Sequence, residues 1–420
     1  MQEKEVLFMY VAIMGYGVVG SGVAELFMKN HESIVSKSTQ SKLELKYILD
    51  IRDFKGDPYE DKIVNDVNII INDPEVGIVV ETMGGLHPAY EFVSSCLEAG
   101  KSVVSSNKEL VAVKGRELLA LAEKKNVNFL FEASVGGGIP IIRPISQCLA
   151  ANEIEEVAGI LNGTTNFILT KMISDGMSFE AALKLAQENG YAERNPAADV
   201  EGTDACRKIC ILASLCFGKH VYPDSVHTEG ITAITLADVE YARSWGGVIK
   251  LIACTKRIDE NHIYAMVSPA FVSKHCQLAG VDDVFNAILV RGDAIGDVVF
   301  YGRGAGKLPT ASAVVADIID CAKHSARKKV FGWGDAVPDY VVSHLENETA
   351  LYVRAFSEAS DKLLGRCAAV FGKIETLARE GAPDDEIAFV TPRGKEGELR
   401  EKLASIAGLE PASVIRVTDY

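Results

Sequence analysis

A glycine-rich turn near the N-terminus limits the folds that this chain can adopt. The apolar run VLFMYVAIM, Val6 to Met14, predicts a buried strand of a parallel sheet. The pattern Gly-x-Gly-x-x-Gly follows at once, and VAELFMKN then predicts a helix. A strand, three spaced glycines and a helix in this order are typical of a dinucleotide-binding βαβ unit. The residues expected at the pyrophosphate are Gly15, Tyr16, Gly17, Val18, Val19 and Gly20.

The end of the next predicted strand bears on the choice of dinucleotide. Leu43 to Leu49 predicts a strand, and Asp50 follows it after an intervening Ser/Lys-rich stretch at 33–42. An acid at this position is placed to bond the adenosine ribose hydroxyls of NAD. Arg52 and Lys55 come directly afterwards and are placed to meet the 2′-phosphate of NADP instead. The sequence leaves NAD and NADP open, with NAD expected to be usable and NADP also accepted.

Strands and helices continue to alternate up to about residue 143. Strands are predicted at 77–81, 102–108 and from 129, and helices at 88–100 and 109–126. This alternation predicts a doubly wound parallel sheet of the Rossmann type. Ligands of such sheets bind at the carboxyl ends of the strands. Thr82, Lys108 and Glu132 all lie at predicted strand ends.

The middle of the chain has a different pattern. EEVAGIL predicts a strand, and Asn162-Gly163 then begins a helix. Short strand-like segments at 230–236, 248–257, 263–272 and 298–304 predict a mixed sheet. A second glycine-rich loop ends at Gly306 and precedes a helix at 308–323, which is expected to pack back on the cofactor domain.

An acidic loop in this middle region gathers several charges. The segment GYAERNPAADVEGTDACRK, residues 190–208, contains four carboxylates and Lys208. Asp204 and Lys208 are four residues apart and share one helix face. Taken alone, such a loop is more often a solvated surface with an ordinary ion pair. Carboxylates beside a lysine also suit a substrate that carries an ammonium group and a reactive oxygen.

The chain is too long for one core and divides into several predicted domains. The tail alternates as βαββαβ, which predicts a small ferredoxin-like domain. The expected organisation is an α/β cofactor domain at 1–143, an α+β catalytic and oligomerisation domain at 144–325, a linker at 326–346 and the ferredoxin-like domain at 347–420.

Charge and cysteine usage exclude several classes of function. The net charge of −15 argues against nucleic acid or an anionic membrane as partner. No apolar run reaches the length of a membrane span, and the N-terminus lacks the order of a secretory signal. The nine cysteines show no paired spacing and are expected to be reduced thiols. A cytoplasmic location is therefore expected.

Seven segments, in one order along the chain, carry a resemblance to a known family. They are GYGVVG, ETMGG, SNKELVA, EASVGGGIPII, GILNGTTNFILTKM, AQENGYAERNPAADVEGTDACRK and GRGAGKLPTASAVVADI. Together they resemble homoserine dehydrogenase, the monofunctional kind with a C-terminal ACT regulatory domain, over nearly the whole chain. The resemblance implies NAD(P)-dependent interconversion of L-homoserine and L-aspartate 4-semialdehyde, a step of threonine, methionine and isoleucine biosynthesis.

The resemblance also implies roles for single residues. Lys208 is expected to exchange the proton on the substrate oxygen, and Lys108 to support it beside the nicotinamide. The acids expected to hold homoserine are Glu193, Asp199 and Asp204. A monovalent cation, Na⁺, is expected at main-chain carbonyls of Glu132, Val135, Gly137 and Ile139. Gly306 is expected to contact the cofactor, and the subunits are expected to form a homodimer or homotetramer.

Two departures from the family pattern concern the reacting centre and regulation. Ser106 stands before the Asn-Lys pair, where family members commonly have a small hydrophobic residue. The first loop of the ACT-like domain is SEASDKLLG, with Gly365 displaced into the helix instead of a Pro-Gly turn. Threonine is the expected effector at this domain, and the altered loop predicts weak or absent binding.

Elementary acid–base chemistry agrees with a lysine at the reacting centre. The free lysine pKa of about 10.4 is too high for a general base, so burial or another cation must lower it. Lys108 and Lys208 are each expected to lower the pKa of the other if the fold brings them together. Asp204 would raise the pKa of Lys208 by contact, so it is expected to face the substrate instead.

Two other functions compete with this interpretation. An acylating semialdehyde dehydrogenase would need a cysteine in an electropositive setting, whereas the cysteines here lie in apolar contexts. A non-catalytic protein that senses NAD(P) or an amino acid is the second alternative. The presence of both Lys108 and Lys208 disfavours it.

Overall fold

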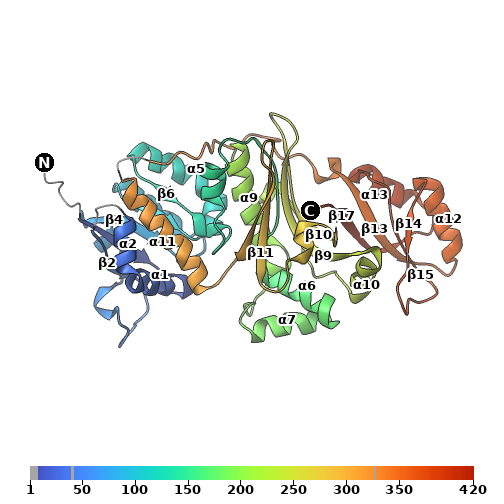
Figure 1. The fold of residues 1–420 in the computed structure, drawn as a ribbon, viewed down its shortest axis with the longest axis horizontal. Helices are drawn as coiled ribbons and strands as arrows, with labels where there is room; N and C mark the ends of the chain where they lie inside the picture. The colour runs from blue at the N-terminus through green and yellow to red at the C-terminus, as the bar shows by residue number, and fades with distance from the viewer. Residues whose placement is uncertain (1–7, 39–41, 326–327) are drawn as a thin grey trace. The chain divides into compact units, whose positions relative to one another are not determined.

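The computed structural model describes residues 8–38, 42–325 and 328–420, which form two compact units (Figure 1). The first unit comprises Met1–Ala151, Cys210–Pro223 and Gly302–Val337, and the second comprises Asn152–Ile209, Asp224–Tyr301 and Pro338–Tyr420. Residues 6–7 of the first predicted strand and residues 326–327 of the predicted linker lie outside the described residues. Within the described ranges, no helix has both the length and the apolar composition that crossing a membrane requires.

The first unit is built on a six-stranded sheet in which every pairing is parallel. Its strands are β1 (Phe8–Met14), β2 (Lys42–Leu49), β3 (Ile63–Val64), β4 (Val76–Glu81), β5 (Ser102–Ser105) and β6 (Phe129–Leu130). The spatial order is β3-β2-β1-β4-β5-β6, so the direction of winding reverses between β1 and β4. The predicted doubly wound parallel sheet is confirmed, and the reversal marks its ligand-binding end.

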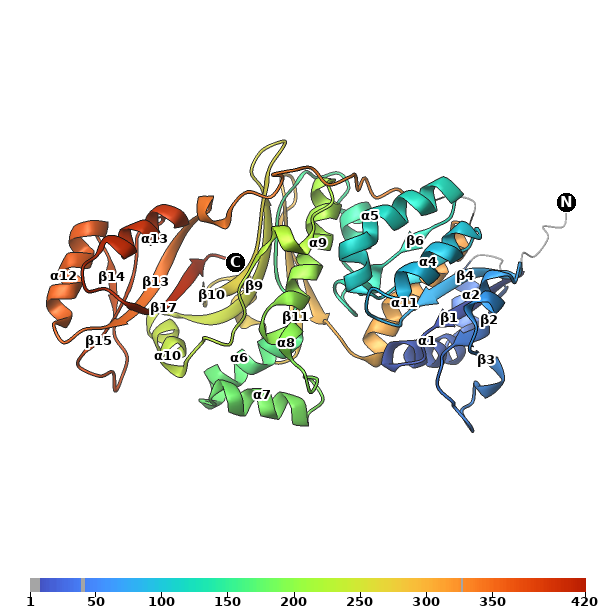
Figure 2. The same cartoon turned by 180° about the vertical axis from the view of Figure 1, so that it is seen from behind.

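Helices cover both faces of this sheet. The helices α1 (Val18–Lys29) and α11 (Lys307–Lys323) lie on the face nearer the viewer in Figure 1, and α4 (Ala89–Glu98) and α5 (Lys108–Lys125) on the face seen in Figure 2. Two short helices, α2 (His31–Lys37) and α3 (Val67–Ile71), complete this part. Buried side chains of β1, α1 and α11 share one apolar cluster, which includes Ile13, Val23 and Val314. The helix expected at 308–323 therefore packs in the core of the first unit.

The junction between β5 and α5 lies earlier than the sequence predicted. The strand expected to reach Lys108 ends at Ser105, and Lys108 is already the first residue of α5. The reason is a helix cap: the side chain of Asn107 accepts a hydrogen bond of 3.1 Å from the backbone N–H of Leu110.

The second unit is built on a mixed sheet of 11 strands. Its central strands are β7 (Ile154–Ile160), β9 (Gly247–Arg257), β10 (Ile263–Ser273), β11 (Phe285–Gly292) and β12 (Gly296–Arg303), with β8 (His227–Thr228) pairing beside β10. The helices of this part are α6 (Gly163–Asp175), α7 (Phe179–Glu188), α8 (Ala197–Val200) and α10 (Leu236–Trp245). The helix α9 (Thr203–Phe217) is divided between the units, with its residues up to Ile209 in the second unit. The predicted mixed sheet is confirmed, whereas β11 and α10 were not predicted.

The prediction of a strand at 230–236 is wrong. This segment turns and then leads into α10, because Thr235 caps the helix in a reciprocal arrangement with Asp238. A Cβ at Gly230 would lie 2.1 Å from the carbonyl oxygen of Val200, so the segment is packed directly on the acidic loop. The apolar residues of 230–236, which predicted a strand, instead pack against the acidic loop.

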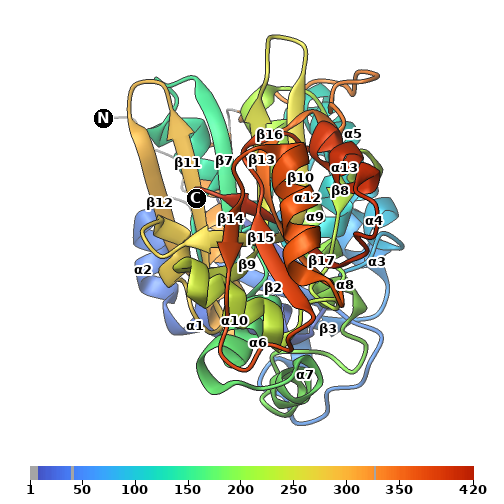
Figure 3. The same cartoon turned by 90° about the vertical axis from the view of Figure 1, so that its right-hand side faces the viewer.

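The tail follows the predicted βαββαβ order. Its elements are β13 (Glu348–Phe356), α12 (Ser360–Phe371), β14 (Glu375–Leu377), β15 (Glu386–Val390), α13 (Glu396–Ser405) and β17 (Pro411–Thr418), with the short β16 (Gly394–Lys395) beside β13. Figure 3 shows α12 and α13 on the same side of β13, β14 and β15. The tail is not a free module, because β17 pairs in parallel with β10 and joins both parts in one sheet.

The segment predicted as a linker is packed at both ends. Trp333 is buried in the first unit, and its Nε1 donates a hydrogen bond of 3.0 Å to His220. Tyr340 is buried in the second unit, where its carbonyl oxygen accepts a bond from the backbone N–H of Ile263 at 2.9 Å. The segment is therefore anchored to each unit by a buried aromatic residue.

Candidate active site

The glycine loop between β1 and α1 is shaped by close approaches of the backbone. Gly15 has a φ of +96°, a left-handed conformation that favours glycine. A Cβ at Gly20 would lie 1.9 Å from the carbonyl oxygen of Gly15, so α1 needs glycine to pack on this turn. Thr82 donates a hydrogen bond of 2.9 Å from Oγ1 to the same carbonyl oxygen. A Cβ at Gly17 would meet no protein atom within 4 Å, which leaves this backbone open to a ligand.

Asp50 lies beside the glycine loop, as its place after β2 predicted. Its Oδ2 accepts a hydrogen bond of 2.8 Å from the backbone N–H of Tyr16. The guanidinium of Arg52 donates two bonds to the same carboxylate, at 3.0 and 2.8 Å. The Arg52 side chain holds the pKa of Asp50 well below its usual range. The predicted ribose-binding acid therefore has its charge offset by the arginine next to it.

A buried glutamate that was not predicted organises the ends of β4 and β5. The carboxylate of Glu81 accepts hydrogen bonds from the backbone N–H of Met83 at 2.9 Å and from the Ser105 hydroxyl at 2.6 Å. The side-chain amide of Asn107 approaches the same carboxylate at 3.4 Å. Burial raises the pKa of Glu81 above its ordinary value. This network fixes the start of α5, where Lys108 lies. The available signal was an acid as the last residue of an apolar strand.

The turn after β6 contains the residues expected to hold a monovalent cation, namely Glu132, Val135, Gly137 and Ile139. The Glu132 side chain is buried, and its carboxylate accepts bonds from three successive backbone N–H groups of residues 141–143 at 2.6 to 2.9 Å. The oxygens of the Glu132 carboxylate are thus already used as acceptors by backbone N–H groups. A cation here would be held by carbonyl oxygens of the turn, a donor set that suits a monovalent ion.

A second glycine-rich loop lies against the same turn. The backbone N–H of Gly138 donates a hydrogen bond of 3.0 Å to the carbonyl oxygen of Arg303. A Cβ at Gly137 would lie 2.3 Å from the carbonyl oxygen of Gly304. Gly306 has a φ of +120° and precedes α11 as its N-cap. The turn at 132–139 and the glycine-rich loop at 302–306, which are distant in sequence, therefore lie in contact in the first unit.

In the second unit, an asparagine joins the acidic loop to the predicted catalytic lysine. The Nδ2 of Asn162 donates hydrogen bonds to Asp199 Oδ1 at 2.7 Å and to Asp204 Oδ2 at 2.9 Å. The Nζ of Lys208 donates to the same Asp204 oxygen at 2.7 Å and to the carbonyl oxygen of Leu161 at 2.7 Å. Asp204 and Lys208 are 3% and 7% exposed. Three of the predicted site residues are thus brought together around one amide.

The expectation that Asp204 avoids contact with Lys208 is wrong, while its predicted contact with the substrate stays a prediction. The two residues are four apart on α9 and form a buried ion pair. The physical reason is burial, because an ammonium without a counter-charge in this position would cost several kcal/mol, on the order of the penalty for an unpaired buried ion. Asp204 therefore acts on the lysine directly.

The remaining residues of the NGTTN motif hold neighbouring loops in place. The hydroxyl of Thr164 donates a hydrogen bond of 2.6 Å to the carbonyl oxygen of Tyr191, at the start of the acidic loop. The amide of Asn166 donates to three carbonyl oxygens within 281–285 at 3.0 to 3.1 Å. Asn162 was missed as a site residue. The signal that could have found it is its position as the helix cap next to a carboxylate-rich loop.

Glu193 and Lys108 are the two other residues predicted for the catalytic and substrate-binding site. Glu193 lies in the acidic loop and is exposed, and its carbonyl oxygen accepts a bond of 3.1 Å from the Gln187 side chain. Lys108 belongs to the first unit and Lys208 to the second. The predicted influence of each lysine on the pKa of the other therefore stays a prediction.

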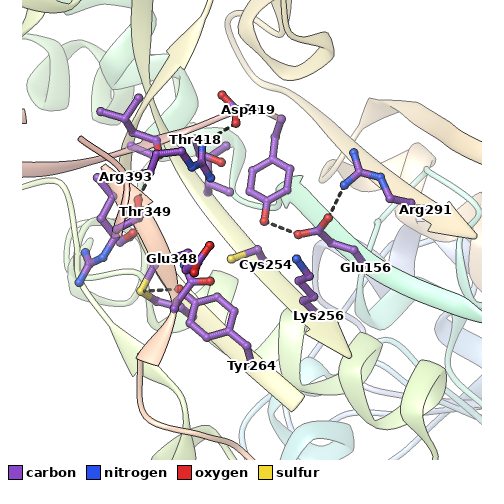
Figure 4. Close-up of a pocket in the computed structure, with 18 residues that line it drawn as sticks. Glu156, Cys254, Lys256, Tyr264, Arg291, Glu348, Thr349, Arg393, Thr418 and Asp419 are labelled. Carbon is purple, nitrogen blue, oxygen red and sulfur yellow. Dashed lines mark hydrogen bonds and ion pairs between the residues drawn. The ribbon is translucent and has the colours of Figure 1, made fainter. Parts of the chain in front are cut away.

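A pocket in the second unit lies away from all of these residues (Figure 4). It has a volume of about 180 Å³ and lies among β9, β10 and the C-terminal residues 416–420. One wall carries a partly buried contact in which the Tyr420 hydroxyl donates to Glu156 at 2.5 Å. The lining includes none of the predicted site residues. The acidic loop and the glycine loops, and not this pocket, carry the chemistry expected of the active site.

The structure gives little support to cysteine catalysis. Burial raises the pKa of Cys96 and of Cys254 to about 12. A cysteine nucleophile instead needs a lowered pKa, since the thiolate is the reactive form. The acylating mechanism considered as an alternative is disfavoured at these two positions.

Comparison with known proteins agrees with this geometry. Residues 15–132 match the family model "Homoserine dehydrogenase, NAD binding domain", and residues 140–319 match "Homoserine dehydrogenase". Homoserine dehydrogenase of Synechocystis sp. is 39% identical, over 97% of this chain and 99% of that protein.

Solved structures show the same fold. A homoserine dehydrogenase from Thiobacillus denitrificans has a TM-score of 0.86 at 34% identity, covering 98% of each chain. A hyperthermophilic archaeal homoserine dehydrogenase, solved in complex with NADPH, has a TM-score of 0.63 at 28% identity and covers 75% of this chain and 97% of its own. On the combined evidence of the two family models and of relatives that match along nearly its full length, the chain belongs to the homoserine dehydrogenase family of NAD(P)-dependent oxidoreductases.

Proposed function

We propose that the chain interconverts L-homoserine and L-aspartate 4-semialdehyde, with Lys208 moving the proton on the substrate oxygen. The observation that carries this assignment is the buried Lys208 ammonium, held between Asp204 and the carbonyl oxygen of Leu161. A bound nicotinamide supplies the hydride chemistry, and the protein must add or remove the proton. A lysine fixed at both sides is suited to that task because its Nζ is held at one place.

The acids of the second unit divide into two roles in this proposal. Asp199 and Glu193 recognise the ammonium group of homoserine, and Asp204 orients Lys208. Support for the division comes from the structure, where Asp204 is paired with the lysine while Glu193 is exposed. Lys108, the first residue of α5 in the first unit, is proposed to support the reacting centre beside the nicotinamide.

The activity is tested with the purified chain, L-homoserine and either nicotinamide cofactor. The absorbance of the reduced cofactor should rise with homoserine and fall with aspartate semialdehyde. If neither substrate changes the absorbance with either cofactor, the proposed reaction is excluded. A chain that binds cofactor but turns over neither substrate would favour the non-catalytic sensor.

The cofactor is proposed to bind with its pyrophosphate at the glycine loop and its ribose at Asp50. Gly17 offers an open backbone there, and Gly306 lies in the second glycine loop. NAD is proposed to be usable and NADP to be accepted. The offset of the Asp50 charge by Arg52 supports acceptance of a 2′-phosphate.

Removal of Arg52 is expected to discriminate the two cofactors. The Arg52 side chain is 58% exposed while paired with Asp50, so its guanidinium can meet a phosphate. Arg52→Ala should lower kcat/KM for NADPH by roughly 10- to 100-fold, the order of one bond to a charged group, with little effect on NADH. Steady-state kinetics with both cofactors measure this, and the NADH data serve as the internal control. An equal loss for both cofactors would contradict the role of Arg52. A strong preference for NADPH that is unchanged in Asp50→Ala would contradict the role of Asp50 in binding the ribose.

A monovalent cation, Na⁺, is proposed at the carbonyl oxygens of the turn 132–139. The observation that supports it is the donor chemistry, since the Glu132 carboxylate is already used by backbone N–H groups. The cation would brace the turn against the second glycine loop. Activity and melting temperature compared in sodium and in tetramethylammonium salts test this site.

The tail is proposed to be an ACT-like regulatory domain with threonine as effector. The βαββαβ order supports it, while the loop before α12 lacks the family's Pro-Gly turn. The Ser360 hydroxyl closes this loop by donating to the carbonyl oxygens of Ser357 and Asp384 at 2.9 and 3.0 Å.

Threonine is accordingly expected to bind weakly. A calorimetric titration of the full chain should give no saturable heat below the millimolar range, and inhibition by threonine should be slight. Serine serves as the matched control ligand. Saturable binding in the micromolar range would contradict the prediction. Deletion of the tail is an unsuitable control, because it would remove β17 from its pairing with β10.

Assembly as a homodimer or homotetramer and a cytoplasmic location complete the proposal. The strand β12 supports assembly, because it ends the sheet and exposes Val299 and Tyr301. Sedimentation at several concentrations tests the subunit number, and a monomer at all of them would exclude assembly.

A further inference from the structure

The side chain of Asn162 is held in one orientation. Its Oδ1 accepts hydrogen bonds from the backbone N–H and the hydroxyl of Thr165, at 2.8 and 3.0 Å, and so caps α6. Its Nδ2 therefore points the other way, toward Asp199 and Asp204. Asn162 is 5% exposed, so water does not compete freely for the amide. Rotation of the amide would lose the cap and place its oxygen against two carboxylates.

We propose that Asn162 is a positioning residue that tunes how tightly Asp204 holds the proton on Lys208. The proposal rests on the assignment of Lys208 as the acid–base residue. The observation that carries it is the shared atom: Asn162 Nδ2 and Lys208 Nζ both donate to Asp204 Oδ2, at 2.9 and 2.7 Å.

The physical argument concerns the charge that Asp204 presents to the lysine. A carboxylate near an ammonium favours the protonated lysine, and so does the carbonyl oxygen of Leu161. An N–H donor on the same carboxylate oxygen takes up part of its negative charge. The lysine then releases its proton more readily in the direction of homoserine oxidation. Asp204 faces Lys208 directly, and Asp199 lies across the shared amide from it.

The chemistry of residue 162 explains why an amide is needed there. An aspartate would keep the helix cap but would add a third carboxylate beside Asp199 and Asp204. A serine would also cap the helix, but its shorter side chain would not reach both acids. These two substitutions therefore separate the cap from the donation to the acids.

The test is the pH dependence of homoserine oxidation. In Asn162→Ser, the rising limb of kcat/KM should move to higher pH by about one unit, the order expected for one hydrogen bond to a charged group. The activity lost at neutral pH should return at alkaline pH, with the KM for the cofactor unchanged. Asn162→Asp should move the limb further in the same direction. Asn162→Asp also keeps the oxygen that caps α6, so it provides the test if Asn162→Ser does not fold.

Asn166→Ser is the matched control. Asn166 lies one turn later, on α6, and is also buried. Its Nδ2 donates to carbonyl oxygens and its Oδ1 accepts from Lys250 at 3.3 Å, so its amide bonds to neither Asp199 nor Asp204. It should lower the melting temperature and leave the pH limb in place. An unshifted limb in both Asn162 variants, or an equal shift in Asn166→Ser, overturns the proposal. Near-normal turnover of Lys208→Ala would instead overturn the assignment of Lys208, so the two failures can be told apart.

Discussion

Replacing Lys208 by alanine is expected to lower kcat by ~10²–10⁴, the usual contribution of general acid–base catalysis. The buried ammonium is held by Asp204 and by the carbonyl oxygen of Leu161, and its Nζ is the proton carrier of the proposed reaction. The cofactor contacts proposed for the first unit do not involve Lys208. Steady-state kinetics should therefore show a loss in kcat, while fluorescence titration shows normal cofactor binding.

Three further variants make this prediction specific. Lys208→Arg should not restore activity, because a guanidinium stays protonated at every working pH. Lys208→Met keeps the volume of the side chain, and its melting temperature shows how much of any loss comes from the broken pair with Asp204. Glu193→Gln should chiefly raise the KM for homoserine. A Lys208→Ala enzyme with near-normal turnover would contradict the assignment.

The part of the fold set by short stretches of sequence could be predicted. The apolar run before Gly15 and the spacing of the three glycines are sufficient for β1 and α1, because both act within one βαβ unit. The alternation of strands and helices that follows is sufficient for the parallel sheet. The same holds for Asp50, whose distance from the glycine loop follows from its place at a strand end. Local pattern and tertiary position agree in these elements.

Features that depend on long-range contacts could not be predicted. The amide of Asn162 reads locally as a helix cap, and only the folded chain shows that its other end meets Asp199 and Asp204. The segment at 230–236 has the composition of a strand, but the Thr235 cap and the packing of Gly230 on Val200 decide otherwise. In each case a partner from a distant segment settles the outcome.

The pairing of β17 with β10 is the largest such feature, and one buried arginine secures it. Arg416, on β17, donates two hydrogen bonds to Glu229 at 2.8 and 2.9 Å and two to Glu396, both at 2.7 Å. Arg416 and Glu396 are 3% and 0% exposed. Two residues after Glu229, the backbone N–H of Ile231 donates to the carbonyl oxygen of Val200 at 2.8 Å. The arginine thus connects the tail to the segment that supports the acidic loop.

Arg416→Met is expected to destabilise the chain by about 3–5 kcal/mol at neutral pH, the usual cost of removing one partner of a buried ion pair. Burial opposes ionisation of Glu229, but the hydrogen bonds from Arg416 outweigh it and lower the pKa of Glu229 from 4.5 to about 2. A lowered folded-state pKa contributes stability that is present above the unfolded value of ~4.3 and is lost as the pH falls toward the folded value. The difference between the variant and the unsubstituted chain should therefore shrink between about pH 5 and pH 2.

Denaturant unfolding at neutral and at acidic pH measures this effect. Arg393→Met is the matched control, because Arg393 also belongs to the tail but pairs with Asp419 at the surface, where the two side chains are 56% and 72% exposed. Its loss should cost no more than ~1 kcal/mol. Since Arg416 also supports the segment under the acidic loop, its loss should raise the KM for homoserine and leave the KM for the cofactor unchanged. A destabilisation no larger than that of Arg393→Met, or one that does not shrink with falling pH, would show that Arg416 does not secure the joined sheet.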